Sequence, residues 1–417
     1  MLNIFEFPLT FLKTTFRSLK YRDFRLFWFG QCISLTGTWV QRTAQVWLVY
    51  SLTKSPLMVG IIGVCQFMPM MLFSLVAGVI VDRFPKKNLL LFTQTVFMLQ
   101  AGIMTVLTFS GRIRVEHVLI LSAVYGLNQT LDMPARQSFF IHLVGRENLI
   151  NAISLNSTIF NLARILGPAV SGFLMVKYNT VFCFFINTLS FIPVIAGIAL
   201  IKSKGDSKHV SGKVLSQIAG GLRYISKNET LILNVLVMAV FCTFAMNNDV
   251  IIPVFAREVL GRGADGYTGL LTASGIGAFI GAVVLAYVSR GGMNKKLLVL
   301  SGILSAAIQF SIFFTRLYLL SAILIAAVGF VNLAFLNTAN SIFQLSSTDE
   351  YRGRVMSVYA FLNQGSTPLG NLYAGSMMEH LGGGAGFLSC GGITLLALIG
   401  ILIFKRKTVR LWFSGNE

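Results

Sequence analysis

The sequence predicts an all-α polytopic membrane protein with twelve transmembrane helices, arranged as two six-helix halves in pseudo-symmetric repeat. Three observations lead to this prediction: an apolar composition, a series of long apolar runs with mostly short loops, and an internal repeat. The 417 residues are 55% hydrophobic and only 12% charged, with a mean hydropathy of +0.73. Soluble domains carry about 25% charged residues, and a chain of this size could not bury so much apolar sequence in water.

The helices are expected where the apolar runs reach the length that a membrane requires. A helix of about 20 mainly apolar residues crosses the hydrocarbon core. The twelve runs cover roughly residues 24–52, 57–81, 88–110, 116–134, 150–176, 180–201, 230–256, 266–289, 297–315, 317–340, 354–378 and 384–404.

One long loop divides the chain. Residues 1–201 form the predicted N-terminal six-helix half, and residues 230–417 form the C-terminal half with a basic tail. Between them, residues 202–229 hold six basic residues and are expected to form a cytoplasmic linker. Its hydrophobic residues from Val214 to Ile225 follow helical spacing, which predicts an amphipathic helix along the inner membrane face.

The basic residues predict the orientation. Of the 34 Lys and Arg residues, 25 fall on the side that contains both termini and the long loop, 7 fall on the other side, and Arg42 and Arg164 lie within apolar runs. Since cytoplasmic loops are enriched in Lys and Arg, both termini are expected in the cytoplasm. The net charge of +19 is therefore explained by topology, and nucleic-acid binding is not expected.

The two halves resemble each other in sequence. A shift of 203 residues places Gly167 on Gly370 and Gly172 on Gly375, together with five further identities in the same register. Parallel six-helix repeats are an arrangement of secondary transporters, in which the substrate site lies between the repeats. The repeat also argues for alternating access within one chain, so we expect a functional monomer.

A cluster of charged residues interrupts the apolar sequence between the second and third runs. The stretch "GVIVDRFPKK" resembles the signature of the major facilitator superfamily, with proline where that signature usually has glycine. In this superfamily the loop makes charge contacts that close the inner gate. The resemblance therefore implies gating roles for Gly78, Asp82, Arg83, Lys86 and Lys87, and the glycine is expected to permit close helix approach.

Further motifs are similar to those of one branch, the drug:proton antiporter-3 group, which includes macrolide efflux pumps and the enterobactin exporter. They are "LDMPARQSFFIHLV", "NAISLNSTIFNLARILGPAVSGFL" and "DEYRGRVMSVYAFLNQG". Asp132 and Arg136 are four residues apart and can pair on one helix face. The resemblance implies gating roles for this pair and for Arg352 and Arg354.

The resemblance implies a secondary active transporter of the bacterial inner membrane. It would export a hydrophobic or amphipathic small molecule (a drug, a siderophore or another metabolite) by proton antiport and alternating access. A lipid or lysolipid mover or an uptake symporter on the same fold remains open. A membrane-embedded transferase is less well supported, since no paired carboxylates, metal cluster or Ser-His arrangement lies at one membrane face. No cofactor or metal is expected.

Four polar residues within apolar runs are candidates for proton coupling or for lining the cavity. Arg42 and Gln45 make the first run unusually polar, and charged residues at membrane depth usually face an interior cavity or a partner. Arg164 lies in the fifth run. Asp249 is the candidate proton carrier in the seventh run.

Small residues and a proline mark the fifth run as a packing helix. Gly167, Pro168 and Gly172 belong to "GPAVSG", which departs from the full antiporter signature at Ser171. Tight helix packing with a kink is the structural interpretation of these residues.

Overall fold

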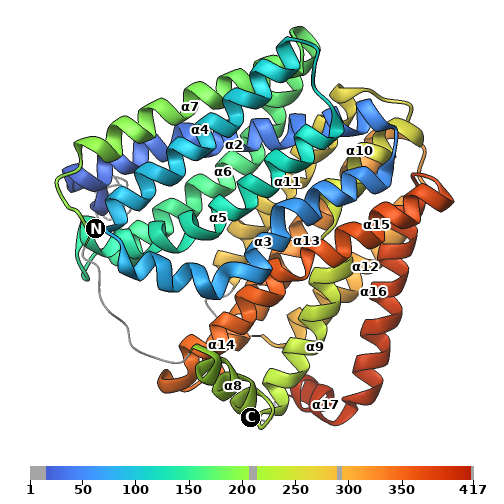
Figure 1. The fold of residues 1–417 in the computed structure, drawn as a ribbon. Helices are drawn as coiled ribbons and strands as arrows, with labels where there is room; N and C mark the ends of the chain where they lie inside the picture. Colours follow the sequence, from blue (N-terminus) through green and yellow to red (C-terminus); the bar gives the residue numbers. More distant parts are fainter. Residues whose placement is uncertain (1–15, 206–213, 289–293, 415–417) are drawn as a thin grey trace, which may run out of the picture. The chain divides into compact units, whose positions relative to one another are not determined.

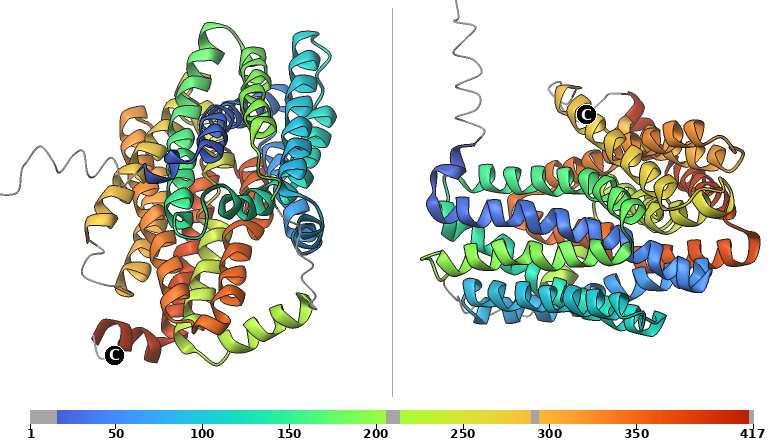
Figure 2. Two further views of the ribbon diagram at one scale, coloured as in Figure 1. Left: turned by 90° about the vertical axis from the view of Figure 1, so that its left-hand side faces the viewer. Right: turned by 90° about the horizontal axis from the view of Figure 1, so that it is seen from above.

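The computed structural model describes residues 16–205, 214–288 and 294–414. Helices and short connections make up this part of the chain, which contains no strand (Figures 1 and 2). The chain divides into two compact units. Unit 1 comprises Met1–Gln45 and Leu72–Ser211, and unit 2 comprises Val46–Met71 and Gly212–Glu417.

The helices fall on the predicted apolar runs, with a few differences in their ends. The N-terminal elements are η1 (Arg17–Lys20), α2 (Arg22–Thr53), α3 (Pro56–Arg83), α4 (Lys86–Phe109), α5 (Val115–Val144), α6 (Leu149–Lys177) and α7 (Thr180–Leu200). The remaining elements are α8 (Val214–Ile225), α9 (Glu229–Phe244), α10 (Asn248–Glu258), α11 (Ala264–Val288), α12 (Lys296–Ile312), α13 (Tyr318–Leu345), α14 (Asp349–Ala360), η3 (Phe361–Gly365), α15 (Thr367–Leu381), α16 (Ala385–Phe404) and α17 (Arg406–Ser414).

Eight helices of the described chain are long and apolar enough to cross a membrane. They include α4, α7 and α16, and the pair α9 and α10 counts as one span from Glu229 to Glu258. The 32-residue helix α2 is not among them, and its buried Gln31, Gln41 and Gln45 account for its lower hydropathy. The membrane-protein class is therefore confirmed, whereas the number of twelve spans stays a prediction.

Three runs fold differently from the uniform helices that were expected. Helix α5 continues through Pro134 to Val144, so Asp132 and Arg136 lie inside a helix rather than at its end. The run 230–256 is broken between α9 and α10. The run 354–378 contains the π-helical segment η3, a local widening that is frequent at functional sites.

The expected linker helix is present as α8, although residues 206–213 of the linker lie outside the described residues. It packs on α14 within unit 2 (Figure 1). The division of the chain into a half 1–201, a linker 202–229 and a half 230–417 stays a prediction.

The two units share part of their helix packing. In unit 1, α4 packs along α7 and α5, and in unit 2, α12 packs along α16 and α13. These helices correspond in the predicted repeat. Large apolar side chains such as Val106, Phe173 and Leu396 remain 59 to 73% exposed, which suits helices that face lipid rather than water.

Candidate functional site

A buried ion pair forms the centre of a polar network in unit 1. Asp132 has no exposed surface, and Arg136 pairs with it from the next turn of α5. Thr93 Oγ1 and Gln94 Nε2 on α4 each donate a hydrogen bond of 2.7 Å to Asp132 Oδ1. Arg136 also donates to Gln31 of α2. The pair predicted from the sequence is therefore present, and its hydrogen bonds link three helices.

A second network of neutral side chains lies along α2. Gln41 Nε2 donates to Gln100 Oε1 at 2.9 Å, and its own Oε1 accepts from Asn187 Nδ2 at 2.8 Å. Gln45 Nε2 donates to Ser122 Oγ at 2.6 Å. These side chains are all buried. The polar character of this helix therefore has a structural use, because it connects α2 to α4, α5 and α7.

The lysines of the charged loop cap helix ends. Lys86 is only 3% exposed, and its ammonium group donates to the carbonyls of Val81 and Phe84 at the end of α3. Lys87 Nζ donates to Ala199 O at 2.9 Å and to Ile201 O at 2.6 Å, at the end of α7. Cations are favourable at helix C-termini, where carbonyls lack intrahelical partners.

The other signature residues lie in the last turns of α3. Asp82 is half-buried and Arg83 is exposed. A Cβ at Gly78 would have no heavy atom within 4 Å among the described residues of unit 1. Its role in close helix approach stays a prediction.

The arginines of the second predicted gate lie on α14. Arg352 Nε donates to Gln344 O at 3.3 Å. The guanidinium of Arg354 lies over the ring of Tyr351. A Cβ at Gly220 or Gly221 of α8 would come within 2.9 Å of the Arg354 side chain. The paired glycines therefore let α8 approach α14 closely, and Arg354 occupies the space that they leave.

The break between α9 and α10 is closed by side-chain hydrogen bonds. Gln309 Nε2 of α12 donates to Ala245 O at 3.0 Å, and Asn247 Nδ2 donates to Thr243 O at 2.8 Å. Asp249 lies in the first turn of α10 and is half-buried. Interrupted helices at membrane depth require such replacement donors, and transporters commonly place binding groups beside them.

The two arginines within apolar runs are half-buried, and they lie on α2 and α6 of unit 1. The guanidinium of Arg42 lies 5.0 Å from the centre of the Trp39 ring, one turn earlier on α2. A cation over an indole ring gains electrostatic attraction. Arg42 is therefore held in place partly by its own helix.

The predicted packing residues of α6 are buried. A Cβ at Gly167 would lie 2.3 Å from Trp39 Cβ, so only glycine permits the observed approach of α6 to α2. Pro168 lies inside the helix, and Gly172 is buried four residues after it. Gly370, the repeat counterpart of Gly167, lies equally close to α9, where a Cβ would be 1.9 Å from Thr243 O.

A group of residues in unit 2, which we call the carboxylate clasp, was not foreseen. It comprises Tyr50, Ser55, Glu258 and Glu379. Tyr50 Oη donates to Glu258 Oε1 and Ser55 Oγ donates to Glu379 Oε2, both at 2.7 Å. The backbone N–H groups of Gly383 and Leu57 donate to the same two carboxylates at 2.7 and 3.1 Å. The clasp holds the α2–α3 connection against α10 and α15.

These additional residues gave weak signals in the sequence. Glu258 and Glu379 close apolar runs, where a carboxylate is also common as a simple solvated helix end. Gln94, Gln100 and Asn187 are single polar residues in apolar runs, and no spacing between them indicates a network. Their partners lie between 38 and 324 residues away along the chain.

Comparisons with known proteins identify the family. The family model described as transmembrane secretion effector, a major facilitator group, matches residues 13–415. The chain is 24% identical to the staphyloferrin A transporter of Staphylococcus aureus, over 93% of this chain and 97% of that protein. It is 24% identical to the multidrug efflux pump Tap of Mycolicibacterium fortuitum (90 and 94% covered) and 21% identical to macrolide efflux protein A of Streptococcus pyogenes (92 and 96% covered).

A solved structure supports the fold. The nucleoside transporter NupG superposes with a TM-score of 0.71 at 10% identity, covering 92% of this chain and 98% of that chain. The helical fold and its buried polar networks are consistent with the family match over residues 13–415. The chain is a membrane transporter, not an enzyme, and it belongs to the transmembrane secretion effector family of the major facilitator superfamily.

Proposed function

We propose that this transporter exports a hydrophobic or amphipathic small molecule from bacteria by proton antiport and alternating access. The observation that carries the proposal is the family match, since the relatives include a siderophore transporter and efflux pumps for drugs and macrolides. The substrate would be a compound of one of these kinds or another secreted metabolite. Bacterial relatives also support a location in the inner membrane.

Proton coupling is assigned to Asp249. Its half-buried carboxyl lies in the first turn of α10, directly after the helix break. Carboxyl groups within transmembrane segments are typical of proton relays in transporters, and this carboxyl group lies beside an interrupted helix. Asp132 is a weaker candidate, because it is fully buried and already bonded to Arg136, Thr93 and Gln94.

Arg42, Gln45 and Arg164 are proposed to face the substrate pathway. Arg42 and Arg164 are half-buried on α2 and α6, and Gln45 anchors α2 to α5 through Ser122. Charged side chains at membrane depth mark substrate and ion pathways more often than lipid-facing surfaces.

The inner gate is proposed to consist of two groups. The first comprises the loop residues Gly78, Asp82, Arg83, Lys86 and Lys87 together with the Asp132–Arg136 pair. The second comprises Arg352 and Arg354 on α14, which carry the contact with the linker helix α8. Both groups would face the cytoplasm, with both termini on that side, and one chain would suffice for transport.

The test is accumulation of a compound panel in efflux-deficient cells that express the protein. The panel contains dyes, macrolides, tetracyclines and a catechol siderophore, each measured with and without a protonophore. Lowered accumulation that the protonophore abolishes is the expected result. Raised accumulation would overturn the export direction, and export that survives the protonophore would overturn proton coupling.

Asp249→Asn is the variant for the coupling residue, and Asp265→Asn is its matched control. Asp265 also lies in the first turn of a helix, α11, but it is exposed. Loss of protonophore-sensitive export in Asp249→Asn alone supports the assignment. If both variants keep wild-type protonophore-sensitive export, Asp249 is not the coupling residue, although the protein is still an exporter.

A further inference from the structure

Residues 201–205 form an extended segment that follows α7 and lies against the start of α4, and we call this segment the linker strap. Ile201 comes directly after Leu200, the last residue of α7, and has extended backbone angles (φ −67°, ψ 133°). None of the five residues belongs to a helix, yet Ile201 and Gly205 are buried. A buried segment without helical hydrogen bonds needs other partners for its backbone groups, and unit 1 supplies them.

The strap and the start of α4 pair through their backbones. The N–H of Lys86 donates to Gly205 O at 3.4 Å, and the N–H of Lys87 donates to Lys204 O at 3.2 Å. Both donors belong to the first turn of α4, where backbone N–H groups have no partner within the helix. Pro85, the N-cap residue of α4, supplies no side-chain cap. The carbonyls of the strap therefore cap α4 in place of a side chain.

The side chain of Lys87 makes the contact reciprocal. Its ammonium group donates to Ala199 O at 2.9 Å and to Ile201 O at 2.6 Å. These carbonyls lie at the end of α7, where carbonyl groups lack donors within the helix and favour a cation. The end of α7 and the start of α4 therefore each satisfy backbone groups of the other.

A carboxylate on α2 fastens the middle of the strap. Asp23 Oδ2 accepts from the N–H groups of Lys202 at 3.2 Å and Ser203 at 3.4 Å, and Asp23 Oδ1 lies 3.6 Å from Arg22 Nη1. Asp23 is half-buried in the first turn of α2. Hydrogen bonds to an ionised acceptor are stronger than those between neutral groups. The strap is thereby tied to α2 as well as to α4.

The strap ends at a position that strongly favours glycine. Gly205 has a φ of +68°, a conformation that residues with a side chain rarely adopt. An added Cβ would also lie 3.0 Å from Lys86 Cβ and 3.1 Å from Phe139 Cδ2 of α5. A side chain here would push the strap away from α4. Gly205 therefore offers a second place, independent of Asp23, at which the strap can be released.

We propose that Asp23 is a positioning residue of the inner gate and acts through the linker strap on Lys86 and Lys87. This inference rests on the gating role proposed above for the two lysines. The ammonium group of Lys86 donates to Val81 O and Phe84 O at the end of α3. Asp23 fixes the strap, the strap caps α4, and Lys86 joins α4 to α3. The α3–α4 loop keeps its shape while the strap is bound, and release of the strap frees it.

The test is hydrogen exchange in the purified full-length protein, read by mass spectrometry at the N–H groups of Lys86, Lys87, Lys202 and Ser203. Asp23→Ala removes the acceptor of the last two groups. Their exchange is expected to become about 10- to 100-fold faster, the worth of a hydrogen bond to a charged group. Because the strap is released as a unit, the N–H groups of Lys86 and Lys87 should accelerate by a similar factor, although neither contacts Asp23.

Two further variants examine the strap from both ends. Asp23→Asn keeps one acceptor oxygen, so an intermediate acceleration is expected. Gly205→Ala should accelerate the same four N–H groups from the other end of the strap. The double variant Asp23→Ala/Gly205→Ala should exchange no faster than the faster single variant, since a strap that is already released has no more contacts to lose.

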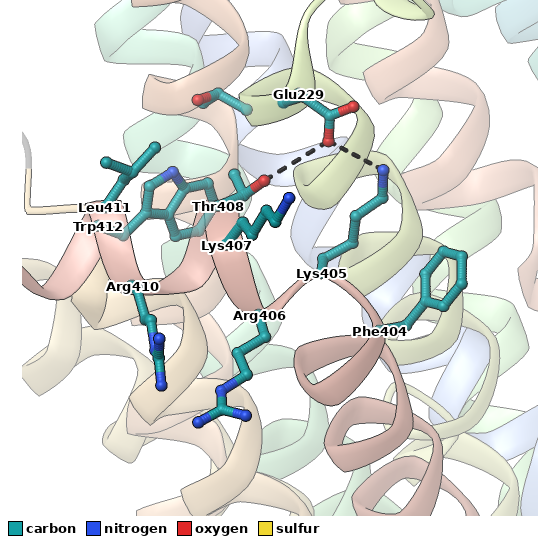
Figure 3. Close-up of a pocket in the computed structure, with 10 residues that line it drawn as sticks. Glu229, Phe404, Lys405, Arg406, Lys407, Thr408, Arg410, Leu411 and Trp412 are labelled. Atoms are coloured by element: carbon teal, nitrogen blue, oxygen red, sulfur yellow. Dashed lines mark hydrogen bonds and ion pairs between the residues drawn. The ribbon is translucent and has the colours of Figure 1, made fainter.

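Glu229→Ala is the matched control in unit 2. Glu229 also lies in the first turn of a helix, α9, and its Oε2 accepts from Lys405 Nζ at 2.9 Å and from Thr408 Oγ1 at 3.5 Å (Figure 3). Together with three further basic residues of α17, they line a basic cavity of about 760 Å³. The control removes the same charge and a contact of the same kind, and the four N–H groups in unit 1 should exchange as in the wild type.

Export distinguishes a positioning role from a merely structural one. With a substrate found in the compound panel, Asp23→Ala is expected to lower the maximal rate of export at least about threefold at equal amounts of folded protein, since gate movements set the turnover of many proteins of this kind. Asp23→Asn should recover part of this loss, in line with its slower exchange. Glu229→Ala should export at the wild-type rate.

Two results would overturn the proposal. The first is faster exchange at Lys202 and Ser203 in Asp23→Ala without any change at Lys86 and Lys87, which would show that the strap does not hold α4. The second is release of the whole strap with wild-type export, which would remove Asp23 from the gate and leave the proposed function intact. Exchange needs no substrate, so a wild type that exports nothing would overturn the proposed function and the gating role, whereas the strap itself would stand.

Discussion

The hydroxyl of Tyr50 donates a 2.7 Å hydrogen bond to Glu258, a residue 208 positions later in the chain. Together with the bond from Ser55 to Glu379, this contact fastens the connection between α2 and α3 to α10 and α15. All four residues lie near helix ends of unit 2. The carboxylate clasp therefore ties the α2–α3 connection to two other helices of the same unit.

Breaking the clasp is expected to destabilise the state in which it is formed. Tyr50→Phe removes one hydrogen bond to a charged acceptor, which is worth about 1.5–3 kcal/mol. Glu258→Gln removes the charge and keeps an acceptor for only one of its two donors, Tyr50 Oη and Gly383 N–H, so a loss of similar size, about 1.5–3 kcal/mol, is expected. A double-mutant cycle on thermal unfolding of the purified protein measures the coupling. Strictly additive effects of the two substitutions would show that the bond does not stabilise the folded protein.

Removing one member of the buried ion pair is expected to lower the stability of the folded protein more than removing both. Asp132→Ala leaves the Arg136 guanidinium without its carboxylate at a site that is nearly closed to solvent, which costs about 3–5 kcal/mol. Asp132→Asn with Arg136→Gln keeps the shape and leaves no unpaired charge, so its stability should lie closer to the wild type. Thermal unfolding of the three proteins in one detergent checks this order. A double variant less stable than Asp132→Ala would contradict it.

Close helix contacts make two glycines intolerant of any side chain. Gly167→Ala and Gly370→Ala would place a Cβ 2.3 Å from Trp39 Cβ and 1.9 Å from Thr243 O, so the helices must move apart. Overpacking of this kind costs about 1–3 kcal/mol or more. Gly78→Ala is the control, since its Cβ has free space and alanine favours a helix by about 1 kcal/mol over glycine. The midpoint of thermal unfolding should fall for the first two variants and not for the third.

The break between α9 and α10 depends on Gln309. Gln309→Leu removes the donor to Ala245 O and leaves that buried carbonyl without a partner, at a cost of about 1–3 kcal/mol. Asn247→Ala should have a similar effect through Thr243 O. Ser311→Ala is the control, because Ser311 is exposed and bonds only to a carbonyl of its own helix. If the break supports transport, the first two variants should also lower export in the accumulation assay at equal expression.

The sequence was a good guide to features that depend on neighbouring residues. Long apolar runs specify membrane helices, since each backbone group is satisfied within the helix itself. The pairing of Asp132 with Arg136 could be predicted for the same reason, because four residues make one helical turn. The amphipathic helix α8 also followed from local spacing.

The sequence was a poor guide where one helix meets another. Nothing in the local sequence indicated that Lys86 and Lys87 would donate hydrogen bonds to backbone carbonyls at the ends of α3 and α7. No local pattern marks the partner of a single polar residue in an apolar run, so Gln100, Asn187 and the carboxylate clasp were missed.

The amino-acid sequence by itself determined the membrane-protein class, the positions of the helices and the family, because hydropathy and motif residues are properties of consecutive positions. Only the tertiary structure decided which polar side chains pair and that the helix is interrupted between α9 and α10. It also decided that α17 forms a basic cavity with the start of α9. Such groups meet across long stretches of chain. Their contacts depend on how the apolar faces of the helices pack, and this information is distributed over the whole sequence.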